Sequence, residues 1–369
     1  MKIVFYLNIV SPHQLPLARA VAERVGQENF IYIYDEDFHA ERAKMGWNDK
    51  VEGLRIEKLN DENSRLLESA DILYTGIRCL DLMAKRSAAG RRTVYYSERW
   101  FKPIQFCGML LPGWLRMLSL RYRKLARQMV SLLNEPTMKY LPCGPWAAKD
   151  LAGVGLRQSQ IVPWGYFVES STFNDQSSIT KDNSTTLKLL WVGRLLKLKR
   201  VDTIIQAVGY LVSQTPQTSQ TSQTSQTSQT SQTILLDIYG SGPDEERLKN
   251  LASKHGDIIV LHPPVPIAEV RKLMREHDVY VLSSNGMDGW GAVVNEALEE
   301  GMYVIGTRET GASAAMLPEE SLFSCGDWKR LASLLSRCVE AKRSGTLKGQ
   351  GIGEWTAKNA AERLLDMAV

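Results

Sequence analysis

The segment that most constrains the fold of this chain runs from residue 278 to residue 301 and reads DVYVLSSNGMDGWGAVVNEALEEG. Its first residues, Asp278 to Leu282, have the length and the β-branched content of a buried strand. Beyond Gly291, the apolar residues Val293, Val294 and Ala297 recur at helical spacing. A strand, a glycine-rich turn and a helix in this order are typical of α/β proteins with a parallel sheet.

The predicted turn suits a diphosphate ligand. Gly286, Gly289 and Gly291 permit tight backbone geometry and the close approach of a ligand. The free N–H groups at the start of the helix, with the positive end of the helix dipole behind them, attract an anion. Asp288 and Glu296 add carboxylates that can bind hydroxyl groups. The segment also fits an ordinary strand–helix turn with Glu296 on a solvated face, and by itself it leaves both interpretations open.

The same residues resemble the donor-site motif of GT-B glycosyltransferases of family 4, which reads E-G-F-G, four residues, then E-A. In this chain Asp288-Gly289-Trp290-Gly291 precede four residues and then Glu296-Ala297, with Asp288 in place of the usual Glu. The resemblance implies that Glu296 holds the ribose of a nucleotide and that Asp288 lies near the donor sugar.

A second motif follows a predicted strand at Leu187 to Val192 and consists of Gly193-Arg194-Leu195, three residues, then Lys199. Arginine offers a planar fork and lysine a mobile point charge, so the pair suits a diphosphate. The motif resembles the G-R-L, three residues, K motif of the same family, with Arg200 where the family usually has Gly.

Two further turns complete the resemblance over residues 187–315. Gly240-Ser241-Gly242-Pro243 follows a predicted strand at Ile234 to Tyr239, and His262 follows another at Ile258 to Leu261, where the family contacts the nucleobase. The resemblance implies donor binding by nine residues: Gly193, Gly240, Gly242, His262, Gly289, Trp290, Gly291, Ala292 and Val293. It places Asp288, Glu296, Arg194 and Lys199 in catalytic roles.

A chain of 369 residues is long enough for two domains with separate cores. We expect an α/β chain of the GT-B type, with two Rossmann-like domains facing a central cleft. The predicted parts are an acceptor-binding domain (1–168), a polar linker (169–186), a nucleotide-sugar-binding domain (187–354) and a C-terminal helix that packs back on the first domain (355–369). The S-Q-T repeat at 213–233 lacks large apolar residues and predicts a disordered loop.

The first domain is predicted from four apolar runs at 2–7, 30–34, 71–75 and 93–96, joined by helical segments. Ligands of such sheets bind at the carboxyl ends of the strands. This makes Ser11, His13, Glu98 and Arg99 candidates for binding the acceptor. His13 also fits a surface or packing role, and Glu98 and Arg99 also fit a simple ion pair.

Asp35-Glu36-Asp37 is a D-x-D run after a strand, as in the metal-dependent transferases of a different fold. The C-terminal motifs favour a solvated strand end instead. We therefore expect no metal or other cofactor beyond the nucleotide-sugar co-substrate, and no nucleic-acid partner.

Composition limits the class of protein further. The hydrophobic and charged fractions, 44% and 23%, are typical of a soluble globular protein, and no apolar run is long enough to span a membrane. The five cysteines are scattered and odd in number, which argues against a disulfide framework and fits a reducing cytoplasm.

Charge is distributed unevenly along the chain. Residues 1–170 carry 24 Lys and Arg against 18 Asp and Glu, whereas the remainder carries 21 against 23. Within the first part, residues 106–130 predict an amphipathic basic helix that either lies on an anionic membrane or packs on the sheet. We expect a cytoplasmic protein with peripheral contact at the inner face of the membrane.

The resemblance implies a retaining, metal-independent glycosyltransferase that moves a sugar from a nucleotide diphosphate to a hydroxyl of a glycan or lipid-linked acceptor in cell-surface polysaccharide synthesis. Two alternatives stay open: a non-catalytic nucleotide-sugar-binding subunit of a partner enzyme, and a sugar-nucleotide epimerase or hydrolase on the same fold. A dinucleotide oxidoreductase is disfavoured because no G-x-G-x-x-G follows a strand.

Overall fold

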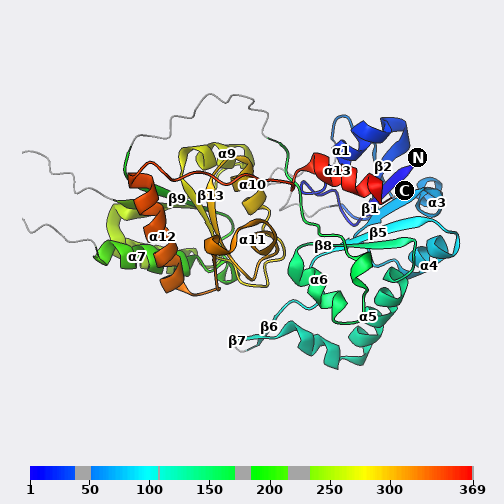
Figure 1. Cartoon of the computed structure of the whole chain (residues 1–369), viewed down its shortest axis with the longest axis horizontal. Helices are drawn as coiled ribbons and strands as arrows, with labels where there is room; N and C mark the ends of the chain where they lie inside the picture. Colours follow the sequence, from blue (N-terminus) through cyan, green and yellow to red (C-terminus); the bar gives the residue numbers. More distant parts are fainter. Residues whose placement is uncertain (38–50, 107–108, 171–183, 215–232, 368–369) are drawn as a thin grey trace, which may run out of the picture. The chain divides into compact units, whose positions relative to one another are not determined.

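The computed structural model describes residues 1–37, 51–106, 109–170, 184–214 and 233–367 (Figure 1). The chain divides into two compact units, which are described separately. Unit 1 comprises Met1–Ser170 and Ile352–Val369, and unit 2 comprises Ser171–Gly351. Most of the predicted linker and nearly all of the S-Q-T repeat lie outside the described residues.

Unit 1 is built on a six-stranded parallel sheet in the order β3-β2-β1-β4-β5-β8. The four predicted strands are confirmed, and β1 pairs with β2 in the register Ile3↔Phe30. Every residue of β1 is buried, as expected for a parallel strand covered by helices on both faces. The strands are β1 (Ile3–Leu7), β2 (Phe30–Tyr34), β3 (Ile56–Lys58), β4 (Ile72–Thr75), β5 (Arg92–Ser97) and β8 (Met138–Pro142).

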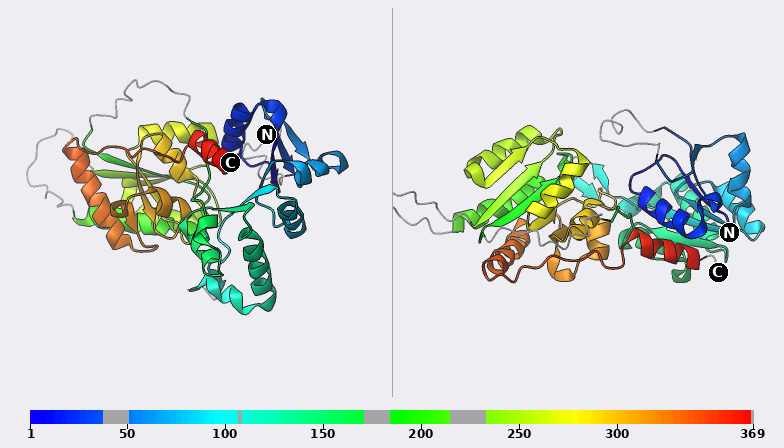
Figure 2. Two further views of the ribbon diagram at one scale, coloured as in Figure 1. Left: turned by 45° about the vertical axis from the view of Figure 1, so that its right-hand side comes forward. Right: turned by 90° about the horizontal axis from the view of Figure 1, so that it is seen from above.

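Helices on both sides of this sheet complete the cores of unit 1 (Figure 1). They are α1 (Leu15–Val25), α3 (Asp61–Ser69), α4 (Leu80–Ala88), α5 (Leu120–Leu133), α6 (Pro145–Ala152) and α13 (Ala357–Asp366). Although α13 comes from the far end of the sequence, it packs against α1, and both views of Figure 2 show the two helices side by side. Ala360, Ala361 and Leu364 are its buried residues, and Arg24 of α1 forms an ion pair with Glu362.

Unit 2 repeats the same topology, with the order β11-β10-β9-β12-β13-β14. Both sheets thus have the strand order 3-2-1-4-5-6 of a Rossmann fold. The prediction of an α/β chain with two Rossmann-like sheets is confirmed. The strands are β9 (Leu187–Val192), β10 (Ile234–Tyr239), β11 (Ile259–His262), β12 (Val279–Leu282), β13 (Tyr303–Thr307) and β14 (Leu322–Phe323).

One continuous core, formed by residues such as Trp191, Ile204 and Leu335, joins the sheet of unit 2 to its helices. These helices are α7 (Val201–Gln214), α8 (Glu245–Ala252), α9 (Ile267–Glu276), α10 (Val293–Glu299), α11 (Gly311–Met316) and α12 (Trp328–Arg343). In the part of the chain that the structure describes, no helix is long and apolar enough to cross a bilayer.

The prediction of one amphipathic helix within residues 106–130 is wrong. The segment contains an antiparallel hairpin of β6 (Ile104–Phe106) and β7 (Met109–Leu111), a 3-10 helix η2 (Gly113–Leu118) and only then α5. Pro112 has an extended backbone, which ends the hairpin and separates it from η2. Ser119 is also extended and caps α5 by accepting a hydrogen bond from the N–H of Tyr122.

Candidate donor-binding site

The turns after β9 and β10 are joined by backbone hydrogen bonds at the carboxyl edge of the unit 2 sheet. The N–H of Gly193 donates to Tyr239 O over 3.0 Å, and that of Leu195 donates to Ser241 O over 2.8 Å. A Cβ atom at Gly240 would lie 1.9 Å from Gly193 O, and one at Gly242 would lie 2.5 Å from Leu195 O. These two glycines are therefore required for the packing of one turn on the other.

Lys199 and Asp288, which the sequence placed in separate motifs, form an ion pair in unit 2. Lys199 Nζ lies 2.7 Å from Asp288 Oδ2, and the two side chains are 19% and 17% exposed. The segment after β12 also holds the backbone next to Lys199, because Ser283 Oγ donates to Lys199 O over 2.7 Å. An ammonium group has three donors, so Lys199 can bind an anionic ligand while it contacts Asp288.

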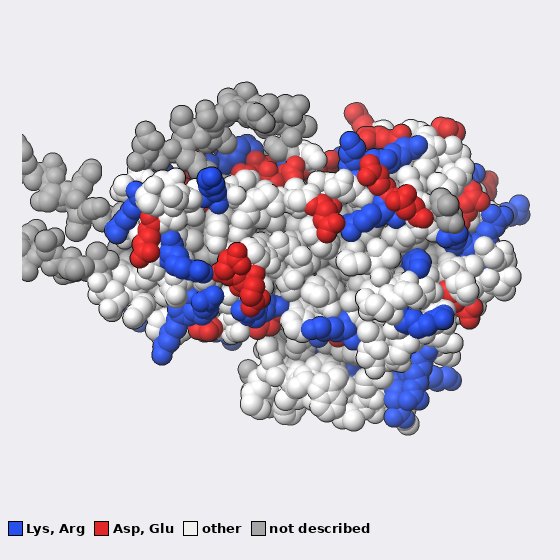
Figure 3. All heavy atoms as spheres, viewed as in Figure 1, with Lys and Arg blue, Asp and Glu red and all other residues white. Residues whose placement is uncertain are grey.

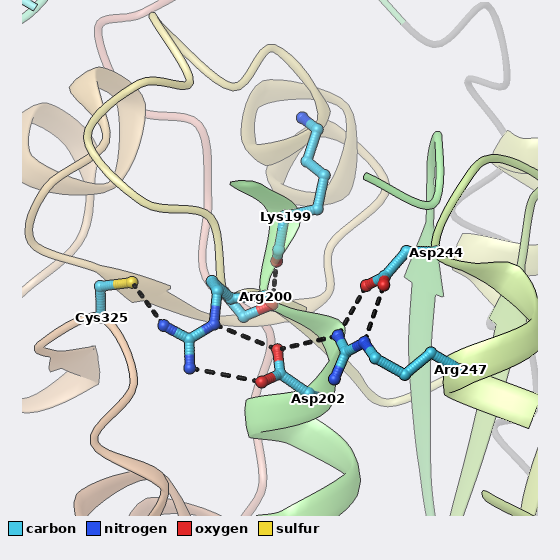
Figure 4. A network of polar contacts seen from close by, with 7 residues as sticks. Lys199, Arg200, Asp202, Asp244, Arg247 and Cys325 are labelled. Atoms are coloured by element: carbon cyan, nitrogen blue, oxygen red, sulfur yellow. Dashed lines mark hydrogen bonds and ion pairs between the residues drawn. The ribbon is translucent and has the colours of Figure 1, made fainter. Parts of the chain in front are cut away.

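A network of ion pairs fixes the chain on the other side of Lys199 (Figure 4). The guanidinium of Arg200 donates to both carboxylate oxygens of Asp202, over 3.1 and 3.3 Å. Arg247 likewise donates to both carboxylate oxygens of Asp244, over 2.7 and 2.6 Å. Asp244, in turn, donates its backbone N–H to Leu195 O. The network thus connects the turn that carries Lys199 to the starts of α7 and α8.

Arg200 has a left-handed backbone, with φ of 49°, and it is the one residue other than glycine with positive φ in the described part of the chain. Glycine adopts this conformation most easily. The finding explains why a glycine is usual here in the motif that the sequence resembles.

Of the three glycines predicted in the turn before α10, Gly291 is the one with a left-handed backbone. Gly291 has φ of 89°, and a Cβ atom there would lie 2.9 Å from Leu282 Cδ2. The carbonyl groups of Gly289 and Trp290 accept hydrogen bonds from the start of α11. Ala292 and Val293 lie at the surface end of the turn, and their N–H groups donate to none of the described residues.

Trp290 differs from what its place in the motif suggests. Its side chain is only 1% exposed, and its indole N–H donates to Asn295 Oδ1 over 2.7 Å. The indole is therefore a packing group, and only the backbone of this residue is available to a ligand.

Glu296, in the first turn of α10, is the carboxylate of this region best suited to bind a ligand. Its side chain makes no hydrogen bond or ion pair with the residues that the structure describes. Glu300, one turn further on, instead takes the contacts of Arg271 and Arg275, over 3.2 and 2.8 Å. Burial raises the pKa of Glu296 to about 7, with Arg271 lowering it and Glu300 raising it. A partly buried carboxylate that has a raised pKa and no partner among the described residues is a common property of functional sites.

Tyr280 connects the two carboxylates of the site. Its hydroxyl donates to Val192 O at the end of β9 over 3.2 Å. Burial raises the pKa of Tyr280 strongly, and the nearby charges of Glu296 and Asp288 raise it further. Both carboxylates therefore lie near the same phenol.

Arg194 is the fourth predicted catalytic residue. Its side chain is exposed and forms no ion pair with any residue in the described ranges. The structure places it next to Gly193 at the carboxyl edge of the sheet, without a partner that fixes its direction.

His262 belongs to a cluster that the sequence did not predict. Its Nε2 lies 2.5 Å from Asp237 Oδ1, while His277 Nε2 lies 3.2 Å from Asp237 Oδ2. Burial opposes ionisation of Asp237, but the hydrogen bonds from both histidines outweigh it and lower the pKa of Asp237. Tyr239 stacks on the His262 ring at 4.3 Å. The signal in the sequence was an aspartate inside an otherwise apolar strand.

In unit 1, the predicted acceptor-side residues separate into two groups. Glu98 accepts hydrogen bonds from Tyr166 Oη over 2.9 Å and Lys102 Nζ over 2.5 Å. His13 stacks on the Tyr166 ring at 5.4 Å, and burial lowers the pKa of His13 although Glu98 opposes this.

Arg99 instead pairs with Asp150 over 3.3 Å, so an Arg99–Glu98 pair does not form. Ser11 accepts backbone hydrogen bonds at the start of α1 through its carbonyl group. The structure thus joins His13 and Glu98 through Tyr166, which the sequence analysis did not single out.

The D-x-D run after β2 has partners within the protein. Tyr6 Oη donates to Asp35 Oδ2 over 3.2 Å, and Lys58 Nζ lies 2.6 Å from Asp37 Oδ2. Burial raises the pKa of Asp35, with the Tyr6 hydrogen bond opposing the shift.

Residues 173–346 match the family model of the glycosyl transferases group 1. Among solved structures, HepE from Anabaena in complex with UDP is similar, with a TM-score of 0.64, 15% identity, and coverage of 100% of this chain and 97% of that one. A glycosyltransferase from Rickettsia africae aligns with a TM-score of 0.66, 12% identity, and 100% and 97% coverage. The galactosyltransferase WaaB of the lipopolysaccharide outer core aligns with a TM-score of 0.63, 15% identity, and 100% and 99% coverage.

No curated protein sequence matches the chain. At such low identity the structural neighbours show the fold alone, and the family model assigns residues 173–346 of the second unit to the glycosyl transferases group 1. Residues 173–346 form a group 1 glycosyltransferase domain, and the chain is a glycosyltransferase of the GT-B fold.

Proposed function

We propose that this glycosyltransferase moves a sugar from a nucleotide diphosphate to a hydroxyl of a glycan or lipid-linked acceptor, with retention of configuration and without a metal ion. The observation that carries the proposal is the convergence of Lys199, Asp288 and Glu296 in the family-matched domain. These residues supply a cation for the diphosphate and two carboxylates for neutral hydroxyls.

Negative charge develops on the diphosphate as its bond to the sugar breaks. We assign stabilisation of this charge to Lys199 and Arg194, together with the N–H groups of Ala292 and Val293, which have no described acceptor. Such preorganised donors are usually the largest single contribution to catalysis. The flexibility of an exposed Arg194 lets it close on the diphosphate after binding.

Glu296 is assigned to the ribose hydroxyls. Two hydroxyl donors favour the charged form of a carboxylate, so binding lowers the raised pKa of Glu296. Asp288 is assigned to the donor sugar, and its contact with Lys199 joins sugar and diphosphate recognition. Known HepE structures contain UDP and UDP-glucose, and we therefore take uridine nucleotides as the first donors to test.

The acceptor is assigned to unit 1, where Ser11, His13, Glu98 and Tyr166 lie at or after the carboxyl ends of strands or contact residues there. We place the reaction in the cytoplasm, at the inner face of the membrane, in cell-surface polysaccharide synthesis. A galactosyltransferase of lipopolysaccharide among the structural neighbours supports this choice of pathway class.

The Lys199–Asp288 pair also favours one alternative. Asp288 is one methylene shorter than the usual Glu, and Lys199 holds it over 2.7 Å. Its carboxylate therefore extends less far toward the donor sugar than that of a glutamate would. A non-catalytic subunit that binds a nucleotide sugar for a partner enzyme would bind the donor without turning it over.

The test is isothermal titration with UDP, GDP and ADP and their glucose or galactose conjugates, with and without EDTA. We expect one nucleoside diphosphate and its sugar to bind equally well in EDTA. The Glu296→Gln variant should bind more weakly, while Glu269→Gln, an exposed glutamate of α9, serves as a matched control.

Binding that requires Mn²⁺ and is lost in Asp35→Asn would contradict the proposed site, as would no binding to any of the nucleotides. Binding of a nucleotide sugar that is neither slowly hydrolysed nor used for sugar transfer would favour the non-catalytic alternative.

A further inference from the structure

Six large hydrophobic side chains within residues 106–120 of unit 1 are exposed. They are 45–73% exposed, and they make up six of the nine exposed large hydrophobics in the described residues. We call them the apolar tip: Phe106, Met109, Leu110, Trp114, Leu118 and Leu120. Single exposed hydrophobics are common, but a concentration of them marks a surface that binds another apolar phase.

The backbone beneath the apolar tip is well anchored. Strands β6 and β7 pair Phe106 with Met109, and a Cβ atom at Gly113 would lie 1.7 Å from Phe101 O, so η2 starts directly against the core. Arg116 Nε donates to Lys102 O over 3.1 Å. These contacts keep the hydrophobic side chains outward, and no rearrangement is needed to expose them.

Basic residues accompany the tip, and acidic residues are absent from the sequence around it. Residues 99–134 contain seven Lys and Arg and no Asp or Glu. Lys102 and Arg99 are neutralised by Glu98 and Asp150. In contrast, Arg121, Arg123, Lys124 and Arg127 of α5 form no ion pair with the residues that the structure describes.

The elements that carry these residues lie in one part of unit 1. In Figure 1 the β6–β7 hairpin and α5 extend together from the sheet of unit 1. Figure 3, seen from the same side, shows an uncharged surface there with Lys and Arg at its edge. An apolar centre bordered by unpaired cations is complementary to a lipid bilayer with anionic headgroups.

We propose that the apolar tip inserts into the headgroup region of an anionic bilayer while the cations of α5 contact lipid phosphates. Trp114 is well suited to this depth because its ring is amphipathic. A protein partner is less favoured, because it would have to supply acidic groups that match four unpaired cations. This inference rests on the membrane location in the proposed function. Donor binding does not require lipid, so vesicle binding and nucleotide binding fail separately.

The experiment is flotation of the full chain with vesicles of phosphatidylcholine alone or mixed equally with phosphatidylglycerol. We expect binding to the anionic vesicles that weakens with salt. Each basic residue near such a surface contributes roughly fivefold, so Arg121→Glu with Lys124→Glu should weaken binding at least tenfold. Lys254→Glu, an exposed lysine of unit 2, is the matched control.

The apolar part is tested by Trp114→Glu with Leu118→Glu, which we expect to weaken binding at least tenfold. Ile267→Glu in α9 replaces a hydrophobic residue of unit 2 that is 53% exposed, and it should leave vesicle binding unchanged. Thermal melting and UDP titration of each variant show that the chain still folds.

Equal binding of both vesicle types, or no binding to either, would overturn the proposal. The proposal would also be overturned if the wild-type chain formed dimers, bound no vesicles, and became monomeric in the variant with Trp114→Glu and Leu118→Glu. The apolar tip would then join two copies of the chain.

Discussion

The two units share one strand order, but the residues that follow their strands differ in the balance of charged and aromatic side chains. In unit 2 these residues include charged groups, among them Lys199, Asp288 and Glu296. In unit 1 the corresponding region also carries Glu98 and Arg99, but aromatic pairs accompany them: Tyr74 stacks on Tyr96 at 5.3 Å, and His13 on Tyr166 at 5.4 Å. In the proposed function, unit 2 binds the charged leaving group and unit 1 binds a largely neutral sugar ring. Variants of each region can test this division.

The largest effect is expected from Lys199→Ala. Loss of a preorganised donor to developing negative charge costs about 3–4 kcal/mol, or roughly a hundred- to a thousandfold in kcat/KM. The readout is turnover of the donor that the titrations identify. Lys197→Ala, at an exposed position in the same turn, should retain activity. Near-normal turnover in Lys199→Ala would remove this residue from the site.

Glu296→Gln should weaken nucleotide binding by roughly 1.5–3 kcal/mol, the contribution of hydrogen bonds to a charged group. Because the pKa of Glu296 is raised to about 7, affinity in the wild type should increase as the pH rises from 6 to 8. In the variant it should stay constant over that range. Isothermal titration at several pH values measures both effects, and an unchanged dissociation constant would exclude Glu296 from binding.

The raised pKa of Glu296 also predicts how the free energy of unfolding depends on pH. A carboxyl group whose pKa is higher in the folded than in the unfolded chain stabilises the fold at low pH, and this contribution is lost as the pH rises through about 7. Urea unfolding between pH 5 and 8 should therefore show a decline that Glu296→Gln reduces. A wild-type profile that rises with pH and that the variant leaves unchanged would contradict the assigned shift.

Two substitutions of Arg200 distinguish the energetic cost of its left-handed backbone from the contribution of its ion pair. Arg200→Ala keeps a side chain in the left-handed conformation and loses both contacts with Asp202, which should cost about 1–2 kcal/mol of the free energy of unfolding. Arg200→Gly also loses the contacts but relieves the strain, so it should cost less. Equal losses in both variants, measured by urea unfolding, would show that the conformation carries no strain.

The smallest effect is expected in unit 1. Tyr166→Phe removes the hydrogen bond to Glu98 and should lower the free energy of unfolding by about 1 kcal/mol. UDP affinity should stay unchanged, because the residue belongs to the unit without the donor site. A weaker UDP affinity in this variant would break the proposed division between the units.

The sequence predicted best those elements whose burial follows a regular pattern. The bounds of β2, β9 and β10 agree with the apolar runs, because parallel strands buried on both faces are nearly continuous apolar segments. The short edge strands β3 and β14, with three and two residues, gave no such signal. The prediction of a single helix at 106–130 was wrong because the exposed leucines and arginines of this segment have the spacing of an amphipathic helix.

The site was predicted in part for a similar reason. Glycine spacing located the turns, since Gly291 must adopt a left-handed conformation. Contacts between residues far apart in sequence, such as Asp237 with His262 and His277 or His13 with Tyr166, depend on which strands become neighbours. That information lies in the tertiary structure, and a local pattern does not contain it.

The position of α13 in unit 1 has a consequence for synthesis on the ribosome. Because α13 covers α1, and all of unit 2 lies between them in sequence, unit 2 is topologically an insertion into unit 1. The sheet and α1 of unit 1 leave the ribosome first. The residues Ala360, Ala361 and Leu364 of α13, which is packed against α1, are translated only after unit 2. The nascent chain thus completes its second unit before its first.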